Sequence, residues 1–208
     1  MISGLYAITR ETDNTAQLLA AVTAVLNGGA RTVQYRDKSG DVARQHEQAS
    51  VLMTLCRRYH VPFIVNDSLR LADLIGADGV HLGRDDGTVR EARIILGPDR
   101  IIGVSCYHSL DLALAAQEAG ADYVAFGRFF SSGTKPNATP AELSLLRQAT
   151  YQIHRPIVAI GGVTLSNANH LISAGADAVA VIGALFDRQD VEEAARQFAD
   201  LFVDETED

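Results

Sequence analysis

Short runs of β-branched and other apolar residues alternate with longer segments of helical periodicity along the whole chain. Residues 15–27 form the clearest helical segment, because apolar side chains recur at intervals of three and four and a Gly-Gly pair follows. Eight apolar runs are typical of strands, and each precedes a candidate helix. These runs are residues 5–9, 32–36, 63–66, 79–82, 101–105, 123–127, 157–160 and 178–181. The pattern therefore predicts eight consecutive strand–helix units.

A short turn sequence recurs three times and indicates an internal repeat. Gly-Ala-Asp stands at 76–78, 120–122 and 175–177, each time between a helical segment and a strand, and its glycine can take the left-handed conformation that ends a helix. Eight units in 208 residues are typical of a small (β/α)8 TIM barrel, whereas a flavodoxin-like open sheet needs about five strands. We expect an α/β fold with a single barrel domain over residues 1–203 and an acidic tail at 204–208.

Composition and charge narrow the class of protein. The chain is 47% hydrophobic with a net charge of −8, which supports a full core and argues against a broad nucleic-acid surface. No window approaches the roughly 18 apolar residues of a membrane span, and the chain enters its first strand without a signal-peptide pattern. The two cysteines form no C-x-x-C motif, so we expect reduced thiols. We expect a soluble, cytoplasmic protein without nucleic-acid or membrane partners, and the sequence leaves open whether it forms a homo-oligomer.

Lysine is rare in this chain, since only Lys38 and Lys135 accompany the arginines among its 18 basic residues. Both lysines follow apolar runs, in segments rich in hydrogen-bonding side chains, where a compact ammonium can meet a phosphate. The active site of a barrel lies where the strands end, so the side chains just after each strand are the candidates. Alternation along the second strand places Gln34, Arg36 and Lys38 on one side, where they can converge on one ligand.

Two aspartates complete a candidate diphosphate site. Arg36, Lys38 and Lys135 supply positive charge, while Asp67 and Asp86 follow the third and fourth strands. Carboxylates of this kind supply the oxygen ligands that Mg²⁺ accepts beside substrate phosphates. The structural alternative is that each aspartate caps the helix that follows it, because aspartate is a preferred N-cap residue. The sequence does not decide between the two.

Glycines and histidines mark other strand ends. Gly161-Gly162 and Gly183 stand after the last two strands, where barrels often bind phosphate through backbone N–H groups, although a tight turn into the next helix explains the pair equally well. His81 lies inside the fourth strand, which is typical of a packed, hydrogen-bonded histidine. His108 follows the fifth strand, where a proton-transfer role stays open.

Taken together, the segments after the strands resemble the thiamine-phosphate synthase family, from the first strand to the last helix. They follow the family's order and its 20-residue step from Asn66 to Asp86. The segments that carry the resemblance are residues 34–38, 66–67, 81–86, 105, 134–135 and 161–162. The resemblance implies a TIM barrel that joins 4-amino-5-hydroxymethyl-2-methylpyrimidine diphosphate to hydroxyethylthiazole phosphate and releases pyrophosphate.

The resemblance also implies a role for each group of residues. The pyrimidine diphosphate would be bound by Gln34, Tyr35, Arg36, Asp37, Lys38, Asn66, Ser105 and Lys135. The thiazole phosphate would be bound by Ser132, Gly133, Thr134, Gly162, Ile182 and Gly183. Asp67 and Asp86 would bind Mg²⁺, the expected cofactor. Arg36, Lys38 and Lys135 would act in catalysis on the departing pyrophosphate.

The chain departs from the family pattern at four places. Ser68 replaces an acidic residue, Arg84 stands where glutamine is frequent, and Gly183 falls where serine can occur. The segment Ser-Cys-Tyr-His at 105–108 is one residue longer than the usual Ser-x-His. None of these changes removes a proposed metal ligand.

The expected chemistry favours one function over two alternatives. Because an aminopyrimidine is electron-rich, we expect loss of pyrophosphate to leave a carbocation that the thiazole nitrogen captures, while residues 131–140 close as a lid and exclude water. A thiazole tautomerase of the same barrel lineage would need a histidine and no diphosphate site. A non-catalytic sensor would keep the barrel and bind thiamine phosphate as a signal. The cations and carboxylates after strands two to four favour the synthase.

Overall fold

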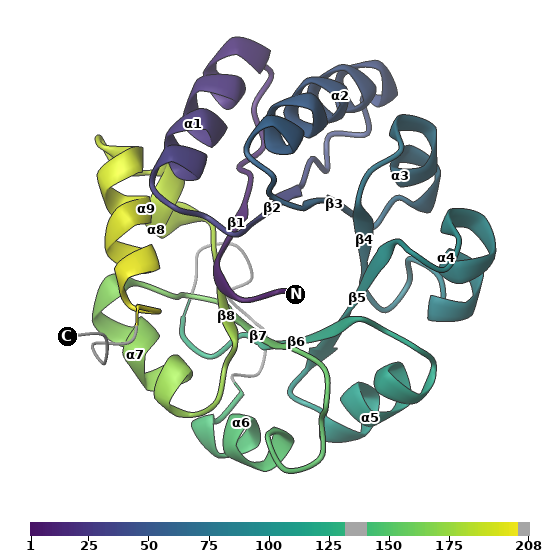
Figure 1. Cartoon of the computed structure of the whole chain (residues 1–208), viewed down its shortest axis with the longest axis vertical. Helices are drawn as coiled ribbons and strands as arrows, with labels where there is room; N and C mark the ends of the chain where they lie inside the picture. The colour runs from purple at the N-terminus through teal and green to yellow at the C-terminus, as the bar shows by residue number, and fades with distance from the viewer. Residues whose placement is uncertain (132–140, 204–208) are drawn as a thin grey trace.

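Eight parallel strands close into a barrel in the computed structural model, each paired with the next along the chain and the last paired with the first (Figure 1). The structure describes residues 1–131 and 141–203. The strands are β1 (Gly4–Ile8), β2 (Thr32–Tyr35), β3 (Phe63–Asn66), β4 (Gly79–Leu82), β5 (Ile101–Tyr107), β6 (Tyr123–Gly127), β7 (Ile157–Ile160) and β8 (Ala178–Val181). The short apolar runs thus pair in the parallel order that strand–helix repeats require.

Helices follow the strands and lie on the outside of the barrel (Figure 1). They are α1 (Thr15–Asn27), α2 (Val42–Arg58), α3 (Leu69–Ile75), α4 (Val89–Leu96), α5 (Leu110–Glu118), α6 (Leu143–Ala149), α7 (Leu165–Ser173), α8 (Gly183–Phe186) and α9 (Val191–Asp200). The predicted single-domain (β/α)8 barrel is confirmed. Across the described part of the chain, no helix is both long and apolar enough to cross a bilayer.

Five of the eight strands begin and end where the sequence predicts, and three differ at an end. β1 lies one residue earlier than expected, and β2 stops at Tyr35. β5 continues past Ser105 to Tyr107, because the pairing with β6 shifts register between these two residues. The extra residue of the Ser-Cys-Tyr-His segment is therefore absorbed by a bulge inside the strand.

The Gly-Ala-Asp repeat has the same structural role at all three places. Its glycines have φ angles of 64°, 92° and 106°, in the region that favours glycine after a helix. Each aspartate side chain accepts a hydrogen bond from a backbone N–H near the start of the preceding strand. These bonds run from Phe63 to Asp78 (2.9 Å), from Ile102 to Asp122 (2.8 Å) and from Ile157 to Asp177 (2.7 Å). The repeat thus ties β4, β6 and β8 to their neighbours at the amino end of the barrel.

Most of the core lies between the strands and the helices, where outward side chains such as Val33, Phe63 and Val65 are buried. A smaller buried cluster fills the interior of the barrel. It includes Tyr6 and Tyr123, whose ring centroids lie 6.0 Å apart. Because side chains fill the interior of an eight-stranded barrel, the space for a ligand lies at its carboxyl end.

Gly103 makes room for the ring of Tyr123 inside the barrel. A Cβ atom at residue 103 would lie 1.9 Å from Cζ of Tyr123, far inside contact distance. We therefore expect Gly103→Ala to lower the free energy of unfolding by about 1–3 kcal/mol through overpacking. Urea denaturation followed by circular dichroism measures this loss.

The same substitution in a Tyr123→Leu background is the control for Gly103→Ala. The shorter side chain removes the atom that the new methyl group would meet, so the loss of stability should shrink. An equal loss in both backgrounds would show that the backbone of β5, and not the tyrosine ring, requires glycine.

Candidate active site

The loop after β1 holds the end of β2 in place. Oγ1 of Thr9 accepts a hydrogen bond from the backbone N–H of Arg36 at 2.9 Å, and the carboxylate of Glu11 accepts one from the N–H of Lys38 at 3.0 Å. The side chain of Arg36 is half-buried, and no other described residue forms an ion pair or a hydrogen bond with its guanidinium. A guanidinium in this situation is suited to an anionic ligand.

Lys38, Asp67 and Asp86 come together from three different loops. The ammonium of Lys38 forms an ion pair with Asp67, whose backbone N–H donates to the carbonyl of His81 at 2.8 Å. Burial and the adjacent Asp67 carboxyl raise the pKa of Asp86 above its ordinary value, while Lys38 opposes the shift. Neighbouring carboxylates repel each other unless a cation or a proton lies between them. The structure thus brings together three of the side chains that the sequence places in one site.

Neither aspartate caps the helix that follows it. The N-cap of α3 is Ser68, whose side chain accepts a hydrogen bond from a first-turn N–H at 3.1 Å, and the N-cap of α4 is Thr88, which forms a capping box. Asp67 instead has a φ of 64°, which aspartate tolerates better than most residues. The helix-cap interpretation of Asp67 and Asp86 is therefore wrong. Ser68, which replaces an acidic residue of the family pattern, is the N-cap of α3.

The two carboxylates suit Mg²⁺ better than a metal ion whose ligands all come from protein side chains. Mg²⁺ commonly takes one or two carboxylates and completes its shell with water and substrate phosphates. Asp67 and Asp86 offer this number of carboxylates side by side. The described residues contain no group of three or more His, Cys, Asp or Glu side chains that could hold a metal. The pair therefore suits a magnesium ion shared with a phosphate-bearing ligand.

Tyr35 and Asp37 do not join this cluster. The hydroxyl of Tyr35 donates to Gln48 of α2 at 2.9 Å, and Arg44 of α2 donates two hydrogen bonds to Asp37 at 3.0 and 3.2 Å. Burial alone would raise the pKa of Asp37, but the bonds from Arg44 and Ser39 hold it below its usual value. Both side chains thus anchor the loop after β2 on its helix, and the structure does not place them with the other predicted pyrimidine-binding residues.

Gln34, Asn66 and Ser105 lie on the inner face of the barrel. Gln34 and Ser105 each hydrogen-bond to buried side chains of the interior at 2.8 Å. Asn66 comes two residues after Ile64, a member of the interior cluster, so strand alternation puts its side chain on the same face. Three of the predicted pyrimidine-binding residues therefore share the inner face near the ends of β2, β3 and β5.

The segment after β6 lies against the loop after β7. The backbone N–H of Phe130 donates to the carbonyl of Gly161 at 3.0 Å, which continues the pairing of the two strands. Gly162 has a φ of 66°, and a Cβ atom there would lie 2.5 Å from the carbonyl oxygen of Ser131. This approach requires glycine, and it places Gly162 beside the start of the loop that the sequence assigns to the thiazole phosphate.

Ile182 and Gly183 lie at the end of β8, where the short helix α8 begins. Asp187 follows this helix and forms an ion pair with Arg10, so the loops after β8 and β1 are linked. The other predicted residues of this part of the site lie outside the described residues, as does the expected lid after residue 131. These residues are Ser132, Gly133, Thr134 and Lys135.

Arg84 and Tyr107, which belong to two of the departures from the family pattern, contact each other. The guanidinium of Arg84 lies 4.9 Å from the ring centroid of Tyr107, and the backbone N–H of Arg84 donates to the Tyr107 hydroxyl at 3.2 Å. In the same loop, the N–H of Gly83 donates to the carboxylate of Asp86 at 3.0 Å. The longer β5 thus supports the loop that carries Asp86.

The two histidines considered in the sequence and the cysteine beside Ser105 differ in burial. His81 is buried and hydrogen-bonded at both ring nitrogens, and burial lowers its pKa to about 4, which confirms the packed interpretation. Burial raises the pKa of the Cys106 thiol to about 12, so this cysteine is not a thiolate at neutral pH. His108 is exposed just after β5, and its proton-transfer role stays a prediction.

Sequence reasoning missed Tyr6 and Tyr123. Both lie inside apolar strand runs, which suggests ordinary core residues, yet their hydroxyls are 2.7 Å apart inside the barrel. The signal available in the sequence was the hydroxyl itself, because a buried tyrosine needs a hydrogen-bond partner. Each residue has a further bond, from Gln34 to Tyr6 and between Tyr123 and His81, so the two tyrosines connect the predicted site residue Gln34 to the buried His81.

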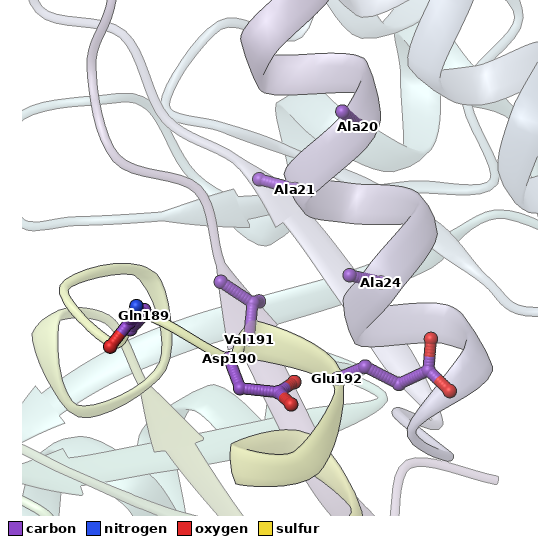
Figure 2. Close-up of a pocket in the computed structure, with 7 residues that line it drawn as sticks. All are labelled: Ala20, Ala21, Ala24, Gln189, Asp190, Val191 and Glu192. Atoms are coloured by element: carbon purple, nitrogen blue, oxygen red, sulfur yellow. The ribbon is translucent and has the colours of Figure 1, made fainter.

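A groove on the outside of the barrel is separate from this site. Figure 2 shows that Ala20, Ala21 and Ala24 of α1 line one side and residues 189–192 the other. Glu192 accepts a hydrogen bond from Asn27, the last residue of α1. Because α1 runs antiparallel to the strands, its end lies away from the carboxyl ends of the strands. The groove is therefore not part of the candidate site.

The chain is similar to one family of proteins over nearly its whole length. The family model described as thiamine monophosphate synthase matches residues 5–185. A thiamine-phosphate synthase of Thiobacillus denitrificans is 63% identical over 205 residues, which are 99% of this chain and 97% of the relative. One of Nitrosospira multiformis is 53% identical over 201 residues, 97% of this chain and 86% of the relative. The structure of thiamine phosphate pyrophosphorylase from Pyrococcus furiosus has a TM-score of 0.86 and 34% identity, with 95% of this chain and 94% of that chain covered.

The barrel, the charged cluster at its carboxyl end and these similarities define the class of protein, which is a single-domain TIM-barrel enzyme with small-molecule substrates. Within that class, the chain belongs to the thiamine monophosphate synthase family. It is a transferase of thiamine biosynthesis.

Proposed function

We propose that this protein condenses 4-amino-5-hydroxymethyl-2-methylpyrimidine diphosphate with hydroxyethylthiazole phosphate in the cytoplasm, with Mg²⁺ as cofactor. The products are thiamine phosphate and pyrophosphate. The observation that carries the proposal is the cluster of Lys38, Asp67 and Asp86 beside an inner face with Gln34 and Ser105. The cluster suits a magnesium-bound diphosphate, and the polar inner face suits a heteroaromatic ring.

The reaction breaks the bond between the pyrimidine methylene carbon and a diphosphate oxygen, and the electron pair leaves with pyrophosphate. The electron-rich aminopyrimidine stabilises the resulting cation, and the lone pair of the thiazole nitrogen then forms the new C–N bond. Arg36 and Lys38 would lie against the leaving group and stabilise the negative charge that grows on it. Mg²⁺ bound at Asp67 and Asp86 would supply further positive charge there.

Neither bond change moves a proton, so the reaction needs no general acid or base. This agrees with the low pKa of His81 and the high pKa of the Cys106 thiol, which keep both side chains neutral at pH 7. The main work of the protein is then positioning. The bonds from Thr9 and Glu11 to the backbone of residues 36–38 serve this purpose, because they fix the segment that carries both cations.

Release of pyrophosphate in a coupled assay tests the proposal. With both substrates and Mg²⁺, pyrophosphate and thiamine phosphate should appear in equal amounts. Omission of either substrate, or removal of Mg²⁺ with EDTA, should abolish both products. Isomerisation of a thiazole phosphate alone would instead indicate the tautomerase, and saturable binding of thiamine phosphate without turnover would indicate the sensor.

A further inference from the structure

A continuous chain of hydrogen bonds crosses the interior of the barrel beneath the candidate site. It joins side chains from five strands, with distances of 2.7–2.9 Å between successive polar atoms. In order, its members are Gln34 of β2, Tyr6 of β1, Tyr123 of β6, His81 of β4 and Ser105 of β5. All members except Ser105 are buried.

The hydrogen-bonded side chains do more than fill the interior of the barrel. Apolar side chains such as Ile64 and Val158 fill the rest of the interior without hydrogen bonds. Buried polar groups are costly unless every one is satisfied, and a fully satisfied network favours one arrangement of its members. The two ends of the chain, Gln34 and Ser105, are also the residues that the proposed function places against the pyrimidine. The chain is therefore positioned to set what these two ends offer to a ligand.

The chain of hydrogen bonds has a direction, because each hydroxyl and the neutral imidazole has one proton to donate. Nε2 of Gln34 donates to Tyr6. In the arrangement that gives every proton an acceptor, Tyr6 then donates to Tyr123, Tyr123 donates to Nδ1 of His81, and Nε2–H of His81 donates to Ser105. A neutral imidazole is needed for this arrangement, and it satisfies the buried His81, because each ring nitrogen is hydrogen-bonded to a hydroxyl group.

The direction of the chain leaves one group free at each end. The hydroxyl of Ser105 accepts from His81 and keeps its own proton for a ligand. The carboxamide oxygen of Gln34 accepts no hydrogen bond from the described residues of the protein, so it is available as an acceptor. If Gln34 turned over, every bond would have to reverse, and Ser105 would donate its proton inward and lose it for the ligand.

We propose that Tyr6, Tyr123 and His81 are positioning residues that couple the two ends, so that Gln34 faces the ligand as an acceptor while Ser105 faces it as a donor. This inference rests on the proposed function and deepens it. The combination matches an aminopyrimidine, whose exocyclic amine donates and whose ring nitrogens accept. A 4-oxo pyrimidine places an acceptor where the amine would lie, and the coupled chain should reject it.

Binding of two inert probes tests the coupling. They are the monophosphates of 4-amino-5-hydroxymethyl-2-methylpyrimidine and of its 4-oxo counterpart, titrated into the full chain by calorimetry. The unaltered protein should bind the 4-amino probe at least roughly tenfold more tightly, the effect of one well-placed hydrogen bond. Tyr123→Phe keeps the ring but frees the proton of Tyr6 to satisfy a turned Gln34. The Kd of the 4-oxo probe divided by that of the 4-amino probe should therefore fall toward one.

A second cut distinguishes coupling from packing. Tyr6→Phe interrupts the chain one bond closer to Gln34 and should also lower the ratio of Kd values. Because either cut separates the two ends, the double variant should discriminate no worse than either single variant. Purely structural residues would give additive losses of thermal stability and would leave the ratio unchanged.

Tyr59→Phe is the matched control, because it removes a tyrosine hydroxyl that donates to Asn27 at 2.7 Å on the outside of the barrel. Its ratio should equal that of the unaltered protein. An unchanged ratio in Tyr123→Phe and Tyr6→Phe, or no preference for the 4-amino probe in the unaltered protein, would overturn the inference. If Tyr123→Phe does not fold, Tyr6→Phe decides by the same criterion. Pyrophosphate release by the unaltered protein, measured separately, shows whether the proposed function itself holds.

Discussion

Replacement of Lys135 by alanine is expected to lower kcat by about two to three orders of magnitude, the loss that follows removal of one donor from a preorganised anion site. The charges of the described cluster explain the size of the effect. Arg36 and Lys38 are balanced by Asp67 and Asp86 when both carboxyls are ionised. A departing pyrophosphate therefore depends on additional positive charge, from Mg²⁺ and from Lys135. Lys135 lies outside the described residues, so the prediction rests on the sequence and on this balance.

Steady-state pyrophosphate release measures kcat for the Lys135 variants, and thermal unfolding checks that their stability is unchanged. Lys135→Arg keeps the positive charge and should retain more activity than the alanine variant. Arg58→Ala is the control, because it removes an exposed cation at the end of α2, away from the carboxyl ends of the strands. A near-normal kcat for Lys135→Ala would remove this lysine from the mechanism.

Periodicity predicted most strand boundaries because the strands are short apolar runs between turn residues, as residues 63–66 and 157–160 illustrate. The end of β5 could not be predicted in the same way. Its last residue, Tyr107, depends on a bulge in the pairing with β6 and on the contact with Arg84 of another loop. Both depend on residues distant in the sequence, which a local pattern does not contain.

The topology alone gathered the charged side chains, because all carboxyl ends of parallel strands meet at one end of a barrel. The topology did not, however, predict the environment of each side chain. Asp37 lies past the last residue of β2, beyond the reach of strand alternation, and its partner Arg44 belongs to the next helix. The choice of helix cap was equally local, because aspartate and serine are both good caps and the φ of 64° at Asp67 decides for Ser68.

The interior network was the least predictable part of the candidate site. Tyr6 and Tyr123 are separated by 117 positions in the chain, and their hydroxyls meet only because the barrel closes. The contact between Gly103 and the ring of Tyr123 likewise requires the parallel pairing of β5 with β6, which puts these two residues side by side. A sequence shows that a buried hydroxyl needs a partner, but the identity of the partner is a property of the closed barrel.

Asp86→Asn is expected to raise the Mg²⁺ concentration for half-maximal rate by at least about tenfold, a loss typical of a damaged metal site. Asparagine keeps a side-chain oxygen that can accept the hydrogen bond from the N–H of Gly83, now at 3.0 Å, so the loop should persist while the negative charge is lost. Asp67→Asn should act in the same direction, because asparagine also tolerates a φ of 64°. It additionally breaks the ion pair with Lys38 and should therefore lower kcat as well.

Titration of the rate with Mg²⁺ at saturating substrate concentrations measures both effects. Asp85→Asn is the matched control, because it makes the same change at the neighbouring, exposed position and should leave the curve unchanged. Since Thr88 caps α4, a role of Asp86 as helix cap no longer competes with metal binding. An unchanged curve for Asp86→Asn would therefore leave Asp86 only its bond to Gly83, and Asp67 would be the one carboxylate of the pair that binds the ion.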